Sequence, residues 1–319
     1  KQRVIMQFVK IAKNSLIFIL LLISTGSYAE TIIEVKAQPQ KGFNFPFILK
    51  IPTNVDTHYL VVETNNTGRV SDDLKVHYES AKKAISGNAV GPWVAKKINA
   101  PIMIPVFPRP KTDWEIYTHS LDRDTLLVKD GVLKRLDLQL LAMISEAQKE
   151  LAKLSIKVQS KVILTGFSAS GSFANRFSLL HPDSLQLIVA GGLNGILMLP
   201  VAAVSDEKLN FPLGVTDFES IIGTHFNKAK WASLPQFLFM GENDTNDAVK
   251  FDDAYSDAER KTIYTALSEN MQPERWAKCQ EIYKANNANV VFRTYKNIGH
   301  GTNLKIHNDI LSFIQKNLK

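Results

Sequence analysis

The sequence predicts an α/β protein built on a mostly parallel, twisted sheet that is flanked by helices. Short apolar runs of strand length alternate along the chain with segments of helical spacing. Strands that are separated by helices pair in parallel through right-handed crossovers, and the helices then cover both faces of the sheet. The chain has 319 residues and shows no repeat or low-complexity tract, so one large domain of this class accommodates it.

The first half of the predicted domain contributes a hairpin and the first strand–helix units. The pattern from 30 to 51 is extended and carries turn signals at 39–42, which suits an antiparallel hairpin. Further along the chain, the apolar spacing predicts strands at 58–63 and 100–107, a helix at 73–85 and a helical face running from Leu136 to Leu151.

The second half continues the alternation. A β-rich strand at 161–165 runs into a helix at 169–180, which ends at His181-Pro182. The remaining apolar patterns predict strands at 185–190, 236–240 and 289–295, a helical stretch at 273–285 and a terminal helix at 303–318.

The first 29 residues have the layout of a secretory signal peptide rather than of a folded element. They carry four basic residues, Lys1, Arg3, Lys10 and Lys13. A short apolar run at 15–24 follows, and 27–29 match a small-x-small cleavage signal before Glu30. The alternative is a retained membrane anchor, but the apolar core is nearer ten residues than the roughly twenty that a span needs. We therefore expect export to a periplasm or beyond the cell, no stable membrane span after cleavage, and a mature domain at 30–319.

Charge and cysteine content exclude some classes of function. The whole chain has a formal net charge of +7. Residues 1–29 hold four basic groups and no acidic one, so the mature part is near +3. This mild charge, with no basic stripe among aromatic residues, argues against a nucleic-acid partner. Cys279 is the only cysteine, so the chain forms no internal disulfide and we expect Cys279 to pack in the core.

The most informative stretch runs from Val162 to Gly171, where a strand enters a Gly-x-Ser-x-Ser-Gly turn and then a helix. This stretch resembles the nucleophile elbow of the α/β-hydrolase family, Gly-x-Ser-x-Gly, with Ser170 in place of the last glycine. The resemblance implies the α/β-hydrolase fold and makes Ser168 the nucleophile. Ser170 is the rival nucleophile, and a Gly/Ser turn without chemistry is the alternative.

In this family the triad follows the chain order serine, acid, histidine. The resemblance therefore assigns Asp244 as the acid, in the loop after the strand at 236–240, with Asp247 in the same loop as the alternative. It assigns His300, between two glycines after the last strand, as the base. His307 is the alternative base, but its helical spacing with Leu304 and Leu311 favours a packed helix face.

The family also implies an oxyanion hole made of two backbone N–H groups. One belongs to Ala169, and the other lies in the loop at 64–68, where Asn65 or Asn66 is the expected donor. Many relatives have His-Gly in this loop, and this chain does not. Arg109 and Trp114 follow the neighbouring strand, where they could contact substrate or serve the structure.

These assignments predict an exported serine hydrolase that cleaves carboxylic esters through an acyl-enzyme. The same triad serves a peptidase, a thioesterase or a polyester depolymerase, and a binding relative without catalysis is a further alternative. The long apolar segment at about 195–232 either caps the pocket or packs as ordinary helices. No spacing suits zinc, and a calcium loop starting at Asp244 fails at Ala248 and Val249. We therefore expect a small or polymeric ester as the partner and no cofactor; the oligomeric state stays open.

Overall fold

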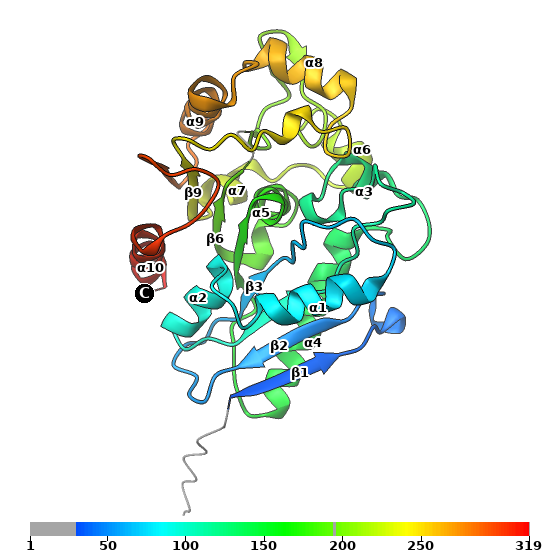
Figure 1. The fold of residues 1–319 in the computed structure, drawn as a ribbon, viewed down its shortest axis with the longest axis vertical. Helices are drawn as coiled ribbons and strands as arrows, with labels where there is room; N and C mark the ends of the chain where they lie inside the picture. Colours follow the sequence, from blue (N-terminus) through cyan, green and yellow to red (C-terminus); the bar gives the residue numbers. More distant parts are fainter. Residues whose placement is uncertain (1–29, 194–195, 319) are drawn as a thin grey trace, which may run out of the picture.

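The computed structural model describes residues 30–193 and 196–318, so the predicted signal peptide lies outside the described residues (Figure 1). Within them, eight strands form one sheet in the order β1-β2-β4-β3-β5-β6-β9-β10. The strands are β1 (Thr31–Val35), β2 (Phe47–Ile51), β3 (Val61–Glu63), β4 (Ile102–Pro105), β5 (Val162–Phe167), β6 (Leu185–Gly191), β9 (Gln236–Gly241) and β10 (Val290–Tyr295).

The pairing confirms the mostly parallel sheet. β1 pairs antiparallel with β2, and β2 pairs antiparallel with β4, so the predicted hairpin forms one edge. All other neighbours in the sheet run parallel, from β4 through β3, β5, β6 and β9 to β10. The carboxyl ends of these parallel strands therefore meet at one edge of the sheet, where ligand sites of open α/β sheets form.

Helices fill the crossovers between the parallel strands (Figure 1). The α-helices are α1 (Leu74–Ala84), α2 (Val90–Lys97), α3 (Arg123–Leu127), α4 (Leu136–Lys153), α5 (Ala169–Leu180), α6 (Phe218–Ile222), α7 (Lys228–Ser233), α8 (Asp257–Ala266), α9 (Trp276–Ala285) and α10 (Leu304–Asn317). Five single turns complete the list: η1 (Pro39–Lys41), η2 (Thr118–Ser120), η3 (Pro182–Ser184), η4 (Ala248–Lys250) and the π-type η5 (Met271–Arg275).

Each face of the sheet has its own apolar core. Residues of α4, α5, α7 and α9 pack on one face, and residues of α1, α2 and α10 pack on the other. Successive strand residues alternate between the two: Val162 and Leu164 of β5 belong to the first core and Ile163 to the second. Because both faces are buried, the strands read as continuous apolar runs in the sequence.

Two differences from the sequence prediction have local causes. α2 was not predicted, because Gly91 and Pro92 are poor helix formers. Both stand in the first turn of α2, where a proline is tolerated because the N–H it lacks has no partner inside the helix. The strand predicted at 58–63 is shorter: Val61, Val62 and Glu63 pair with β5, and of these only Val61 and Val62 also pair with β4.

The segment expected to be either a cap or ordinary packing contains a small hairpin, β7 (Ala203–Val204) with β8 (Glu207–Lys208), followed by α6 and α7. Leu197, Phe211 and Trp231 are buried in the core that covers α5. The hydroxyl of Tyr283 in α9 donates to the carbonyl oxygen of Met198. These contacts join the segment to the main domain, and its role as a cap over the substrate stays a prediction.

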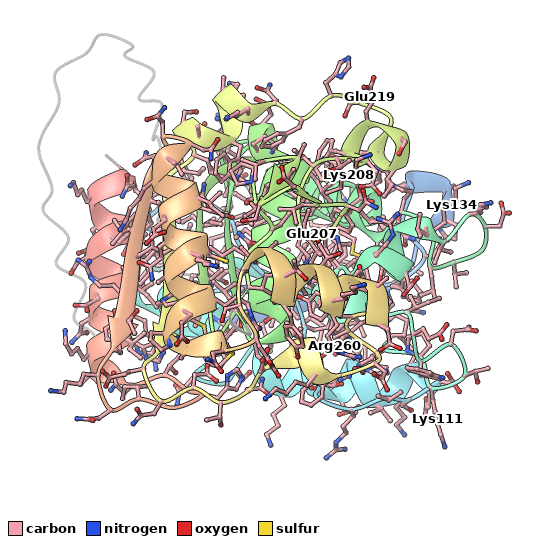
Figure 2. The ribbon with its side chains drawn as sticks, turned by 90° about the horizontal axis from the view of Figure 1, so that it is seen from above. Lys111, Lys134, Glu207, Lys208, Glu219 and Arg260 are labelled. Atoms are coloured by element: carbon pink, nitrogen blue, oxygen red, sulfur yellow. The ribbon has the colours of Figure 1, made fainter. Side chains whose placement is uncertain are left out.

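Many charged side chains lie at the surface, although some, such as Asp247 and Arg275, are buried. Figure 2 shows Lys111, Lys134 and Glu219 pointing outward, and the six residues labelled there include both acidic and basic side chains. None of the described helices has the length and apolar character that a bilayer-spanning helix needs.

The approach of α5 to the sheet generates the first prediction. A Cβ at Gly171 would lie under 3.0 Å from the carbonyl oxygen of Gly191, a backbone atom with no freedom to move aside. We expect Gly171→Ala to push α5 away from β6 at a cost of about 1–3 kcal/mol, which lowers Tm by roughly 2–12 °C. Differential scanning calorimetry measures this shift. Gly301→Ala is the matched control, since nothing lies within 4 Å of a Cβ there; equal shifts in the two variants would contradict the packing argument.

Candidate active site

The turn between β5 and α5 holds Ser168 in a strained backbone conformation. Its φ is 62° and its ψ is −129°, a region that residues other than glycine rarely occupy. The Ser168 N–H donates to the carbonyl oxygen of Gly191 (2.9 Å), and the Ser168 carbonyl oxygen accepts from the Ser172 N–H (3.0 Å). A Cβ at Gly166 would lie under 3.0 Å from the backbone of Ser170. The strand and the helix therefore approach too closely for any side chain at Gly166.

The two serines of this turn differ in what their hydroxyl groups do. Ser170 Oγ donates to the Phe167 carbonyl oxygen (2.8 Å) and accepts from the Phe167 N–H (2.9 Å). Ser170 is 2% exposed, so its hydroxyl is committed to the turn. Ser168 is half-buried, and its hydroxyl makes no hydrogen bond to any residue that the structure describes. This arrangement favours Ser168 over Ser170 as the candidate nucleophile.

His300 and Asp244 lie together, 56 residues apart in the sequence. The His300 Nδ1 to Asp244 Oδ2 distance is 2.9 Å, and the other carboxylate oxygen, Oδ1, accepts from the Asn246 N–H (2.9 Å). Asp244 is 3% exposed, whereas the His300 side chain is 27% exposed. A carboxylate at Nδ1 fixes that nitrogen as the donor and leaves a lone pair on Nε2, which is the state that a general base needs.

His300 lies beside the serine turn without a hydrogen bond to Ser168. Its ring centroid is 4.9 Å from that of Phe167, and a Cβ on Gly192 would lie 3.0 Å from His300 Cε1. His300 Nε2 instead faces Asn246 Nδ2 at 3.2 Å, so the amide occupies the lone pair that would take a proton from Ser168. Catalytic hydrogen bonds are often long or absent until substrate binds.

Asp247 has a different partner. Its two carboxylate oxygens accept from Arg275 Nη1 (2.7 Å) and Nη2 (3.0 Å), and both side chains are buried. Asp247 also accepts from the Val249 N–H and caps η4. A bidentate pair of this kind holds its loop in place. The histidine partner in this loop is therefore Asp244, and Asp247 anchors the loop to η5.

Two of the three predicted oxyanion donors, Asn65 and Asn66, line the cavity that Ser168 also lines. This cavity has a volume of about 280 Å³. The Asn65 side chain is bound to the backbone of Phe107, accepting from its N–H (3.1 Å) and donating to its carbonyl oxygen (3.2 Å). Within the described chain, the backbone N–H groups of Asn65, Asn66 and Ala169 donate no hydrogen bond. They are thus available to a ligand, and their role as an oxyanion hole stays a prediction.

The two rim residues singled out from the sequence differ. Arg109 forms an ion pair with Asp253 and lies over the Tyr117 ring, 3.8 Å from its centroid. It therefore joins the loop after β4 to the loop before α8. Trp114 is 45% exposed. His307 is buried in α10, where its ring stacks on Trp93 of α2 at 4.6 Å, which confirms the packed helix face.

Glu63 was given no role from the sequence. It is the last residue of β3, it is 6% exposed, and it lines the cavity that Ser168 lines. Burial raises its pKa to about 7, against the opposing effect of hydrogen bonds from Thr165 and Gly91. The signal in the sequence was an acidic residue at the end of an apolar strand, directly before the loop of Asn65 and Asn66.

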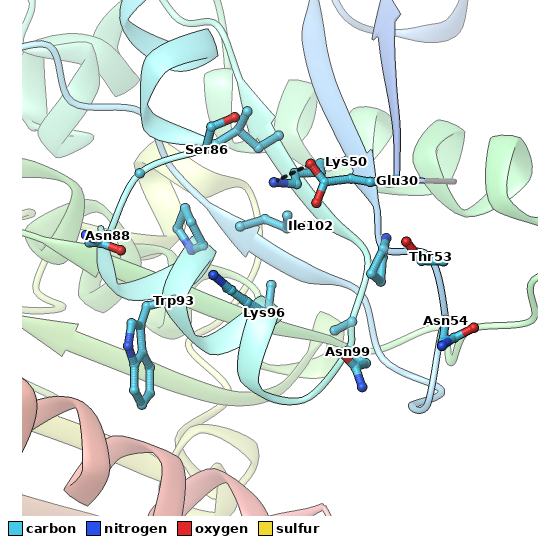
Figure 3. Close-up of a pocket in the computed structure, with 16 residues that line it drawn as sticks. Glu30, Lys50, Thr53, Asn54, Ser86, Asn88, Trp93, Lys96, Asn99 and Ile102 are labelled. Atoms are coloured by element: carbon cyan, nitrogen blue, oxygen red, sulfur yellow. Dashed lines mark ion pairs between the residues drawn. The ribbon is translucent and has the colours of Figure 1, made fainter. Parts of the chain in front are cut away.

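A second cavity, of about 320 Å³, lies elsewhere on the domain (Figure 3). Trp93 and Lys96 of α2 and the Glu30–Lys50 ion pair border it. None of the residues that line it is Ser168, Asp244 or His300. The cavity at Ser168 is therefore the candidate active site.

Comparisons with known proteins identify the fold. No protein-family model matches the sequence, and no curated protein matches it significantly. Among solved structures, the chain is similar to poly(aspartic acid) hydrolase-1 from Sphingomonas sp. KT-1, with a TM-score of 0.57 and 16% identity over 91% of this chain and 98% of that one. It is also similar to a poly(3-hydroxybutyrate) depolymerase from Bordetella parapertussis, with a TM-score of 0.56 and 16% identity over 91% and 90% of the two chains. With its strand order and its serine turn, the chain has the α/β-hydrolase fold.

Proposed function

We propose that the protein is a serine hydrolase that cleaves carboxylic esters through an acyl-enzyme. The observation that carries the proposal is the pairing of Asp244 with His300 beside the strained turn of Ser168. An isolated serine hydroxyl is a weak nucleophile and needs a base that a third group orients. This chain offers all three groups at the carboxyl edge of one sheet.

In the proposed reaction, the Ser168 hydroxyl oxygen attacks the ester carbonyl carbon and His300 Nε2 takes its proton. For this step the Asn246 amide must give up its contact with Nε2. The carbonyl oxygen becomes an oxyanion that accepts from the Ala169 N–H and from the N–H of Asn65 or Asn66. Collapse of the intermediate breaks the carbon–oxygen bond of the ester, and the leaving alcohol takes the proton from His300.

Water then attacks the acyl-enzyme, with His300 Nε2 again taking a proton, and the acid and free Ser168 are released. Asp244 stays ionised throughout and stabilises the imidazolium that forms in each half of the reaction. The same steps cleave amides, thioesters and polyesters. Because two of the similar solved structures are named for a polyamide and a polyester substrate, a substrate panel should include both polymers beside simple esters.

We also propose that the protein is exported, on the strength of its first 29 residues. Expression in a bacterial host with cell fractionation tests this. We expect the protein in the periplasm or the medium with Glu30 as its first residue by mass spectrometry. An uncleaved protein in the membrane fraction would instead support the membrane-anchor alternative.

The proposed roles of Ser168 and His300 predict large losses of turnover. Ser168→Ala and His300→Ala should each lower kcat by roughly three to six orders of magnitude on a chromogenic ester. An active-site phosphonate should label the wild-type chain at Ser168, as located by peptide mass spectrometry. Ser170→Ala is the control on the same turn and should keep labelling at position 168. Labelling at Ser170 would transfer the nucleophile, and no labelling would favour a binding protein without catalysis.

Substitution of Asp244 should mainly lower turnover, and substitution of Asp247 should mainly lower stability. Asp244→Asn should lower kcat by about 10²–10⁴-fold, because the imidazole loses its orienting charge. Asp247→Asn should cost about 3–5 kcal/mol of unfolding free energy, because it leaves Arg275 buried without its partner. Ester assays and urea denaturation of both variants measure the two effects. A greater loss of turnover in folded Asp247→Asn than in Asp244→Asn would reverse the assignment.

A further inference from the structure

The cavity at Ser168 contains an acidic group that the proposed reaction does not use. Glu63 stands at the carboxyl end of β3 and lines this cavity. Among the described residues that line it, Glu63 is the one with a charged side chain. The apolar part of the wall comes from Ala84 and Ala89, with Val90, Ile104 and Phe167. A carboxyl group in such a setting is costly to bury unless its oxygens are hydrogen-bonded.

One carboxylate oxygen of Glu63, Oε2, already accepts two hydrogen bonds. The donors are Thr165 Oγ1 (2.8 Å) and the Gly91 N–H in the first turn of α2. A Cβ at Gly91 would lie under 3.0 Å from Glu63 and Thr165, so the side chain is wedged between β5 and α2. These contacts also cap α2, whose own N-cap residue, Ala89, offers no side-chain acceptor.

The other oxygen has no such partner. Within the described residues, Glu63 Oε1 accepts no hydrogen bond, although a carboxylate has room for about four. Glu63 retains a small exposed area of 6% and borders the cavity. With Oε2 turned to α2, we place Oε1 on the cavity side. A ligand that brings a donor there would satisfy an acceptor that the protein leaves open.

We propose that the cavity beside Ser168 binds a short apolar substrate segment that ends in a hydrogen-bond donor, a hydroxyl or an ammonium group, and that Glu63 Oε1 accepts from that donor. This inference rests on the proposed function and narrows it to esters whose acyl chain carries such a group. The cavity of about 280 Å³ has room for a substrate segment of roughly nine or ten non-hydrogen atoms, at about 30 Å³ for each.

Matched pairs of 4-nitrophenyl esters test the proposal: butanoate against 3-hydroxybutanoate, and hexanoate against 6-hydroxyhexanoate and 6-aminohexanoate. The assays run at pH 8, above the raised pKa of Glu63, which is about 7. We expect the wild-type protein to prefer at least one donor-bearing ester by about 10- to 100-fold in kcat/KM. This is the size of effect that one hydrogen bond to a charged group contributes. A stronger gain for the amino ester than for the hydroxy ester identifies ammonium as the donor.

Glu63→Gln removes the proposed acceptor for the substrate donor but keeps the hydrogen bonds that cap α2. The glutamine oxygen can still accept from Thr165 and Gly91, while its amide group turns a donor toward the cavity. We expect this variant to lose the preference for the donor-bearing ester, measured as the ratio of the kcat/KM values for the donor-bearing and the plain ester in the same variant. A circular-dichroism melt checks that it folds. Glu219→Gln, an exposed acid of α6, should keep the wild-type preference.

Several outcomes would overturn the inference. Equal kcat/KM values for plain and donor-bearing esters in the wild-type protein would do so even if Glu63→Gln failed to fold. A preference that persists in folded Glu63→Gln would also do so, since it would assign the recognition to another group. These results leave the proposed function intact. That function fails separately, if the wild-type protein hydrolyses no ester and the phosphonate labels no serine.

Discussion

The close approach of β5, α5 and β6 is the constraint on which the rest of the site depends. Gly166, Gly171 and Gly191 lie where any Cβ would meet backbone or ring atoms under 3.0 Å away. This packing over-determines the turn and holds Ser168 at a positive φ. The hydrogen bond from the Ser168 N–H to Gly191 fixes the turn to β6. Ser168 therefore lies at the carboxyl end of β5, directly before the first turn of α5.

The loop after β9 carries two carboxylates that have different partners. Asp244 faces His300, and Asp247 faces Arg275, a residue of η5. Both carboxylates are buried, so each needs a partner that compensates its charge. The guanidinium does this permanently for Asp247. The imidazole compensates the charge of Asp244 only when it carries a second proton. The Asp244–His300 pair therefore responds to proton transfer, and the Asp247–Arg275 pair does not.

The fold was largely predictable from the sequence, and the site was predictable only in part. Strands such as Val162–Phe167 were recognisable because burial on both faces makes them largely apolar. The serine turn was recognisable because its small residues follow from local geometry. The choice between Asp244 and Asp247 depends on Arg275, which lies 28 residues beyond Asp247, and no local pattern contains that contact. Glu63 was missed because an acidic residue that ends a strand also suits a solvent-exposed rim, and only the packing of α2 buries it.

The Asp247–Arg275 pair has a consequence for how this protein tolerates sequence drift. Because this buried pair secures the loop independently of the imidazole, the loop keeps one attachment when the group that faces His300 is changed. Asp244 also accepts from the Asn246 N–H and so contributes to the local shape of the loop. Laboratory evolution of the residue that faces the imidazole therefore starts from a loop that retains its anchor to η5.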